Sequence, residues 1–170
     1  MSLSLRSTST RVLVVLPSVV FAEQAAARRP LHPRWLPVLA WGYLQYRLAG
    51  SYRLPRAGGP PGMSQGFPDT LVDTGVYRWT RNPMYLGYLI FATGLTLVTR
   101  SPVAAGATAV LVPWFHRRIE RDERRLIDRF GDSYLEYAAR VPRWLPGTRP
   151  VAGCPEESRD RLEPSARAAR

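Results

Sequence analysis

The stretch that decides the fold reads Asp73-Thr-Gly-Val-Tyr-Arg-Trp-Thr-Arg-Asn-Pro-Met-Tyr-Leu-Gly87. Asn82 is a favourable N-cap residue, and Pro83 suits the first helical position, where its missing N–H has no intrahelical partner to lose. The stretch therefore predicts a helix that begins at Pro83 and carries polar groups at its start. Two apolar segments follow, and then three further blocks, Asp122-Glu-Arg-Arg-Leu126, Phe130-Gly131 and Val141-Pro-Arg-Trp-Leu-Pro146.

Apolar residues gather in four segments, at about 12–22, 35–49, 84–99 and 102–115. Ser101-Pro102 repeats the start signal of the preceding helix, so the last two segments are expected to form a tight helical hairpin. This pattern predicts an all-α, polytopic membrane helical bundle of about four transmembrane helices, with a C-terminal cytoplasmic helical extension. One membrane domain is expected over residues 1–146, with a proline- and glycine-rich loop from Pro55 to Pro68.

The first apolar segment has two interpretations. Arg6 and Arg11 followed by the apolar run to Phe21 resemble a secretory signal peptide with its cleavage site. A short first transmembrane helix that contains Pro17 is the other interpretation. The sequence favours the helix, because the other segments are membrane-like as well.

The chain has a net charge of +11, and all 24 of its basic residues are arginines. They flank the apolar segments instead of forming a basic helix interleaved with aromatic residues, so we expect no nucleic-acid partner. Their distribution over the predicted loops places both termini in the cytoplasm by the positive-inside rule. Cys154 is the single cysteine, and His32 and His116 lie far apart, so no metal site is expected.

The segment after the fourth apolar run shows a helical face with two adjacent acids. Ile119, Asp122, Glu123, Leu126, Ile127 and Phe130 recur at the spacing of one face of an α-helix. A carboxylate on such a face needs a cation or a hydrogen-bond donor, and Arg118 is one local candidate. An ordinary solvated lattice of arginines and acids is the alternative interpretation.

These blocks together resemble the isoprenylcysteine carboxyl methyltransferase and phospholipid methyltransferase family of integral membrane enzymes. The family pattern is matched by Leu71-Val72, Gly75, Tyr77, Arg81, Pro83, Tyr85 and Gly87, and then by Glu123, Leu126, Phe130-Gly131, Tyr134, Val141-Pro142-Arg143 and Pro146. The match covers about residues 69–146. Two positions depart from the pattern: Asn82 replaces a histidine, and Asp122 replaces the first of two glutamates. Asn82 cannot carry a proton near neutral pH, which excludes an acid or base role at that position.

The resemblance implies S-adenosylmethionine as methyl donor, bound at the cytoplasmic ends of the last helices. The implied cofactor-binding residues are Gly75, Tyr77, Arg81, Asn82, Pro83, Tyr85, Leu86, Gly87, Asp122, Glu123 and Arg143, and the implied catalytic residues are Arg118 and Glu123. The acids would face the cationic sulfonium and amine, and the helix start with Arg81 would receive the carboxylate. Arg118 would hold an anionic acceptor, and Arg143 would close the cofactor site or pair with an acid. For Asn82, Tyr85 and Gly87 a cap, an interface aromatic and a packing residue are the structural alternatives.

The implied activity is methyl transfer by in-line displacement to a hydrophobic or lipid-like acceptor, such as a carboxylate or an amine, in an enzyme of a bacterial inner membrane. Membrane lipids are the expected surroundings. A nicotinamide-dependent membrane reductase of similar architecture and a non-catalytic protein that binds anionic lipid remain alternatives. No Gly-x-Gly motif follows a strand, so a soluble doubly wound methyltransferase has no support. Residues 147–170 are expected to be a disordered polar tail.

Overall fold

The computed structural model describes residues 7–58 and 68–145, and this part of the chain is helical, with turns and no strand. The all-α prediction is therefore confirmed for the described residues. The predicted polar tail at 147–170 and most of the predicted loop lie outside them. The elements are α1 (Thr8–Thr10), a π-helical turn (Arg11–Val15), α2 (Leu16–Ala27), a 3-10 turn (Pro33–Trp35), α3 (Leu36–Ala57), a second 3-10 turn (Gly75–Arg78), α4 (Pro83–Thr99), α5 (Pro102–Phe130) and α6 (Asp132–Arg140).

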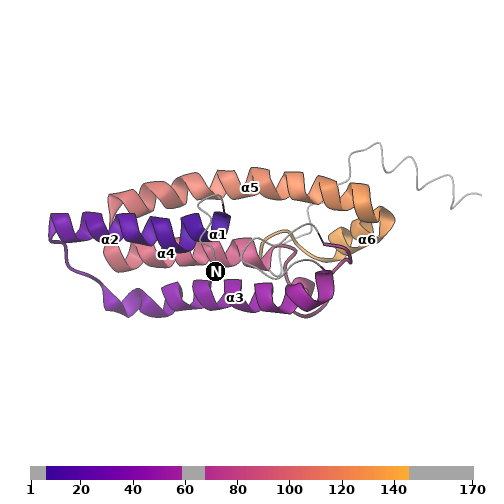
Figure 1. Ribbon diagram of the computed structural model, residues 1–170, viewed down its shortest axis with the longest axis horizontal. Coiled ribbons are helices and arrows are strands. Elements are labelled where there is room, and N and C mark those ends of the chain that lie inside the picture. The colour runs from indigo at the N-terminus through magenta and orange to yellow at the C-terminus, as the bar shows by residue number, and fades with distance from the viewer. Residues whose placement is uncertain (1–6, 59–67, 146–170) are drawn as a thin grey trace, which may run out of the picture.

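The long helices lie side by side along one axis, with α4 between α3 and α5 (Figure 1). The first helical segment, α1 to α2, covers only the half of the bundle that contains the α4–α5 turn. At the other end, the last part of α5 lies beside α6. The connection from α3 to α4 lies at this end as well. One end of the bundle therefore collects the segments that the sequence analysis singled out, and the other end holds two short connections.

The helices differ in the length of their apolar stretches. Within residues 7–58 and 68–145, only the helical segment Thr8–Ala27 is both long and apolar enough to cross a membrane, and α4 is apolar but shorter, with 17 residues. The prediction of about four transmembrane helices thus stays a prediction. The first segment packs on the bundle through Val20, which is fully buried with Leu95 and Ala104. The preference for a first transmembrane helix over a signal peptide also stays a prediction.

Helices α4 and α5 form the expected hairpin. Ser101 caps α5 by accepting a hydrogen bond from the backbone N–H of Ala104 at 3.1 Å, as its position before Pro102 predicts. Helix α5 then runs 29 residues without interruption to Gly131, whose φ of 53° ends it. Its predicted face is packed: Ile119 and Glu123 are buried.

The predicted start of the loop, at Pro55, is wrong. Helix α3 continues to Ala57 and includes Pro55. A proline removes one backbone hydrogen bond, but here the loss falls in the last turn, and Gly58 with φ of 63° ends the helix three residues later. The helix is consequently longer than the apolar segment at 35–49 that indicated it.

Glycines allow α3 and α4 to approach closely. A Cβ on Gly94 would lie 2.6 Å from the backbone of Leu39, and a Cβ on Gly87 would lie 2.7 Å from the backbone nitrogen of Tyr46. Gly42 of α3 faces the backbone of Phe91 in the same way. Gly87 therefore acts as a packing residue, which was the structural alternative for it, because small residues let two helix backbones come into contact.

Substitution of Gly94 by alanine tests this contact. We expect a loss of roughly 1–3 kcal/mol of stability, because the new methyl group meets backbone that cannot rotate away. The measurement is the thermal unfolding midpoint of the purified chain in detergent. Gly106→Ala is the matched control: nothing lies within 4 Å of its Cβ position, so its midpoint should stay equal or rise. Equal effects of the two substitutions would contradict the close contact.

Candidate active site

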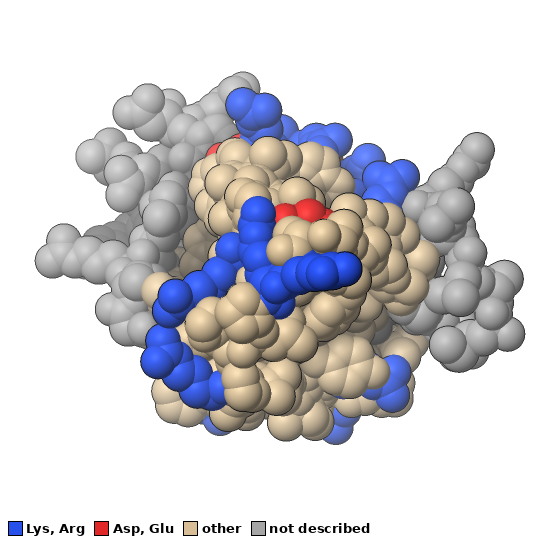
Figure 2. Space-filling view, turned by 90° about the vertical axis from the view of Figure 1, so that its left-hand side faces the viewer, with Lys and Arg blue, Asp and Glu red and all other residues tan. Residues whose placement is uncertain are grey.

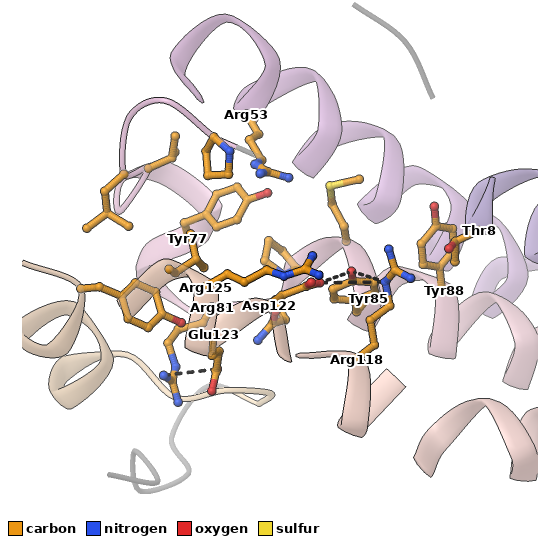
Figure 3. Close-up of a pocket in the computed structure, with 18 of the residues that line it drawn as sticks. Thr8, Arg53, Tyr77, Arg81, Tyr85, Tyr88, Arg118, Asp122, Glu123 and Arg125 are labelled. Atoms are coloured by element: carbon orange, nitrogen blue, oxygen red, sulfur yellow. Dashed lines mark hydrogen bonds and ion pairs between the residues drawn. The ribbon is translucent and has the colours of Figure 1, made fainter. Parts of the chain in front are cut away.

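The candidate site lies where the start of α4, the second half of α5, α6 and residues 141–145 meet. A pocket of about 310 Å³ opens here (Figure 3). This volume is at the lower end of the range for small-molecule sites. The two sequence blocks that were matched to a family pattern thus surround one cavity, although some 40 residues separate them in the chain.

Glu123 is the buried carboxylate of the site. Its side chain is 8% exposed and lies between two arginines. Arg143 donates to Oε2 from Nη2 at 2.7 Å and from Nε at 3.1 Å, and Arg81 Nη1 lies 3.3 Å from Oε1. A buried carboxylate needs cationic or hydrogen-bonding partners, and Glu123 has two guanidinium groups. Glu123 therefore ties α5 both to the start of α4 and to the segment after α6.

The segment after α6 is held by hydrogen bonds from the residues before α4. The backbone N–H of Arg81 donates to the carbonyl of Pro142 at 3.0 Å. Thr80 Oγ1 and Asn82 Nδ2 both donate to the carbonyl of Arg143 at 3.2 Å. Asn82 occupies the N-cap position of α4 but makes no capping hydrogen bond with its side chain, because this amide is turned toward Arg143.

Asp122, beside Glu123 in the chain, points to the pocket. Its Oδ2 accepts a hydrogen bond from the Tyr85 hydroxyl at 2.8 Å, and the same hydroxyl accepts one from Arg118 Nε at 3.0 Å (Figure 3). The Asp122 side chain is 34% exposed. The two adjacent acids thus differ in environment: Glu123 is enclosed by cations, whereas Asp122 remains accessible to a ligand.

Three tyrosines line the part of the pocket next to α6. Tyr77, Tyr134 and Tyr137 are all buried, and the Tyr137 hydroxyl donates to the backbone carbonyl of Tyr77 at 2.8 Å. Burial raises the pKa of Tyr77 to about 12, against a smaller lowering by Arg53. Burial also raises the pKa of Tyr134 and of Tyr137. These rings therefore stay neutral near pH 7 and offer flat apolar faces to a ligand.

Of the predicted site residues, most line the pocket: Tyr77, Arg81, Asn82, Pro83, Tyr85, Arg118, Asp122 and Glu123. Four do not, namely Gly75, Leu86, Gly87 and Arg143. Gly75 has φ of 60° and no room for a Cβ against the Tyr52 ring, so it shapes the turn before Tyr77. Arg143 contacts Glu123, which is one of the two roles expected for it.

Sequence reasoning missed several lining residues, which are Ser7, Thr8, Ser9, Arg53, Tyr88, Arg125 and Tyr137. Tyr134 was part of the matched pattern but was not proposed as a site residue. Ser7 to Ser9 reach the pocket from the start of the first helical segment and Arg53 from α3, and the sequence of these segments carries no motif. Arg125 follows Asp122 by three residues on the same helix, a spacing that points both side chains to one side.

The donors and acceptors of the pocket suit a ligand with charges of both signs. Arg81 is 7% exposed, and its Nε and Nη2 have no hydrogen-bond acceptor among the described residues. Buried guanidinium donors without acceptors are costly, and an anionic group would satisfy them. Asp122 offers a carboxylate to a cation at the same pocket.

Comparison with known proteins supports the resemblance. The family model described as phospholipid methyltransferase matches residues 56–132. Protein-S-isoprenylcysteine O-methyltransferase from Homo sapiens is 42% identical over 79 residues, which is 45% of this chain and 28% of the human protein. Protein-S-isoprenylcysteine O-methyltransferase B from Arabidopsis thaliana is 43% identical over 77 residues, 45% of this chain and 39% of that protein. The chain thus covers well under half the length of these relatives.

A solved structure shows a similar fold. The eukaryotic intramembrane Ras methyltransferase, an isoprenylcysteine carboxyl methyltransferase, superimposes with a TM-score of 0.56 and 24% identity, over 81% of this chain and 52% of that one. The solved structure shows the fold alone, and the family model and the two relatives above confirm the resemblance to the isoprenylcysteine carboxyl methyltransferase and phospholipid methyltransferase family.

Replacement of Glu123 by glutamine should destabilise the end of the bundle by about 3 kcal/mol, because Arg81 and Arg143 would keep buried charges without a counter-charge. Hydrogen exchange of residues 141–145 and the thermal midpoint measure this. Glu136→Gln, an exposed substitution on α6, is the matched control and should change neither quantity. Unchanged protection at 141–145 in the Glu123 variant would contradict the role of the ion pairs.

Tyr77 should make the protein sensitive to alkali. Its pKa is raised from 10.0 to about 12 in the folded chain, so its contribution is fully present below pH 10 and is lost as the pH rises toward 12, by roughly 2 kcal/mol. We expect Tyr77→Phe to reduce the fall in thermal midpoint between pH 9 and pH 11. Tyr43→Phe, which removes an exposed hydroxyl, should leave that fall as in the parent chain, and an equal fall in all three proteins would refute the assignment.

Proposed function

We propose that this chain is an integral membrane methyltransferase that uses S-adenosylmethionine and transfers its methyl group to a hydrophobic or lipid-like acceptor. The observation that carries the proposal is the pocket, in which the start of α4 and the Asp122-Glu123 pair of α5 line one cavity. The relatives named above are methyltransferases by name. The family-model match at residues 56–132 includes α4 and α5, and residues of both helices line the pocket.

The lining fits the groups of S-adenosylmethionine. Asp122 would face its cationic amine or sulfonium, since the Tyr85 hydroxyl occupies Oδ2 and no hydrogen bond of the described residues reaches Oδ1. The orphaned Nε and Nη2 of Arg81 would receive its carboxylate, near the start of α4. The neutral rings of Tyr77 and Tyr134 would lie against its adenosine.

Glu123 then acts through its arginine partners. With Arg143 and Arg81 as its partners, its carboxylate is already neutralised, and its proposed role is to fix the guanidinium of Arg81 in the pocket wall. Asn82 supports the same arrangement, because its amide holds the carbonyl of Arg143. A histidine at this position is thus not needed for the arrangement seen here.

The bound cofactor supplies an electrophilic methyl group, and transfer requires an acceptor in line with the methyl–sulfur bond. The protein's part is alignment and exclusion of water. Arg118 is the proposed contact for an anionic acceptor group: its side chain is 41% exposed and Tyr85 fixes its Nε. Tyr85 thereby links Arg118 to Asp122, which couples the acceptor side of the pocket to the cofactor side.

The placement in the membrane follows from charge. Arginines are numerous at the end of the bundle that contains the pocket, on the loop before α4 and along the second half of α5. The positive-inside rule then puts this end, with both termini, in the cytoplasm, where S-adenosylmethionine is made available. The acceptor's apolar part would lie among the helices.

Calorimetric titration of S-adenosylmethionine and S-adenosylhomocysteine into the detergent-purified full chain tests the proposal. We expect saturable binding that Asp122→Asn weakens at least tenfold for S-adenosylmethionine, because a charge-assisted contact is lost. Asp128→Asn, an exposed acid of the same helix, is the control and should bind as the parent chain does.

Folded protein that binds neither compound would refute the proposal. Binding of a reduced nicotinamide dinucleotide in the same titration would favour the reductase alternative. Binding that survives Asp122→Asn but is lost in Glu123→Gln would transfer the proposed cofactor contact to Glu123.

A further inference from the structure

The end of the bundle opposite the pocket carries a group of four arginines, which we call the arginine end. Its members are Arg28, Arg29, Arg34 and Arg100, all exposed. They come from the connection between α2 and α3, from the 3-10 turn before α3, and from the α4–α5 turn, and this end is seen face-on in Figure 2. None of them contributes to the pocket.

The backbone that carries these arginines is fixed. Gln24, which is buried, donates from Nε2 to the carbonyls of Arg29 at 3.1 Å and Pro30 at 3.2 Å. The backbone N–H of His32 donates to the carbonyl of Val98 at 2.7 Å, which joins this connection to the end of α4. The two arginine-bearing connections are thus held together, and the cations are presented by a preorganised surface.

The charge of this end is not balanced by the residues that the structure describes. Glu23 is the only acid in residues 22–36 and 97–106, and it is already paired with Arg29 at 3.0 Å while accepting a hydrogen bond from Ser101. Among the described residues Arg28, Arg34 and Arg100 have no carboxylate within ion-pair distance. Within residues 7–58 and 68–145, three positive charges therefore have no counter-charge.

Local backbone preferences do not favour these three residues uniformly. Arg28 and Arg100 have φ of 49° and 48°, the left-handed region that glycine normally fills at a helix end. Their charge is favoured there, because both residues follow the C-terminal ends of helices, α2 and α4. Arg34 lies just before α3, where the positive end of the helix dipole disfavours a cation.

Exposed apolar side chains border the arginine end. Leu31 is 50% exposed, Leu36 49%, Phe21 44% and Val103 41%. Arg34 lies over the Trp35 ring, with 5.5 Å from its guanidinium carbon to the ring centroid. Cations at a helix end with apolar and aromatic side chains directly beside them match the boundary between lipid headgroups and acyl chains.

We propose that the arginine end binds the phosphate groups of anionic phospholipids in the leaflet opposite the pocket. The unbalanced charge supplies the attraction, and the apolar border favours a lipid over a soluble polyanion, since acyl chains would cover it. This inference concerns anchoring and orientation, and it stands whether or not the pocket binds a methyl donor.

A fluorophore at the surface itself tests the proposal. In a Cys154→Ser background, Leu31→Cys places the only thiol at the arginine end, and a bimane label there reports binding in the full chain held in a non-ionic detergent. Titration with a short-chain phosphatidylglycerol should give a saturable change in emission, and the matching phosphatidylcholine should not. A second label at Leu145→Cys, beside the pocket end, shows whether a response is local.

The charge contribution is tested with the triple variant Arg28→Asn, Arg34→Gln, Arg100→Asn. Asparagine tolerates positive φ, and Arg29 is kept because it pairs with Glu23. We expect the apparent Kd for phosphatidylglycerol to rise about a hundredfold, because each of the three arginines contributes roughly fivefold. Arg34→Gln alone should raise the apparent Kd about fivefold. This position has no positive φ, so the single variant provides the test if the triple variant does not fold. A triple control, Arg117→Gln, Arg121→Gln, Arg124→Gln, removes the same charge from α5 and should leave the Leu31 response unchanged.

Four results would overturn the proposal: equal responses to the two lipids, an unchanged Kd in the Arg34 variant, an equal loss in the α5 control, or an equal response to glycerol phosphate without acyl chains. The last result would indicate a site for small free anions instead of a lipid surface.

Discussion

The ion pairs of Glu123 are the interaction on which the pocket depends. One carboxylate on α5 is shared by Arg81, just before α4, and by Arg143, after α6. Each arginine also fixes backbone, since the Arg81 N–H binds the carbonyl of Pro142 and the Arg143 carbonyl receives Thr80 and Asn82. Three segments that are distant in the chain are thereby joined at one point. Because the desolvation of a charge is costly when a partner is missing, the three are expected to assemble together.

This constraint separates the roles of two neighbouring acids. Glu123 is enclosed by its arginine partners, whereas Asp122 is partly exposed, and its partners among the described residues are Tyr85 and, more distantly, Arg118. Adjacent residues on a helix point about 100° apart, so a step of one position moves a side chain from the packed face to the pocket. A motif of two acids thus contains one residue suited to architecture and one suited to a ligand.

The sequence predicted the helical elements where local signals are strong. Asn82-Pro83 and Ser101-Pro102 mark the starts of α4 and α5, and Gly131 marks the end of α5. It misplaced the end of α3, because Pro55 is a helix breaker by propensity but is tolerated in a last turn. It assigned the Asn82 side chain to a cap, whereas the structure turns it to Arg143. A contact with a residue 61 positions away has no local signal.

Local sequence signals also explain which residues of the site were predicted. Residues in the two matched blocks were found because their types follow a pattern, and most of them line the pocket. Arg53 and Ser7 to Ser9 were missed because they reach the pocket only through packing of α3 and of the first helical segment. Gly87 fits its structural alternative, since its missing side chain is what α3 requires.

The glycine contacts between α3 and α4 also determine how a long apolar molecule can approach. Gly42, Gly87 and Gly94 bring the two backbones so close that a single methyl group has no space, and a prenyl or acyl chain is far wider than a methyl group. The interface between α3 and α4 is therefore closed to a lipid tail at the positions of these three glycines. Under the proposed function, the apolar tail of an acceptor would reach the pocket along the other flanks of α4, past α5 or the beginning of the first helical segment, where Ser7 to Ser9 line the cavity. Glycines that do not line the pocket would thus determine the side from which an apolar chain can enter it.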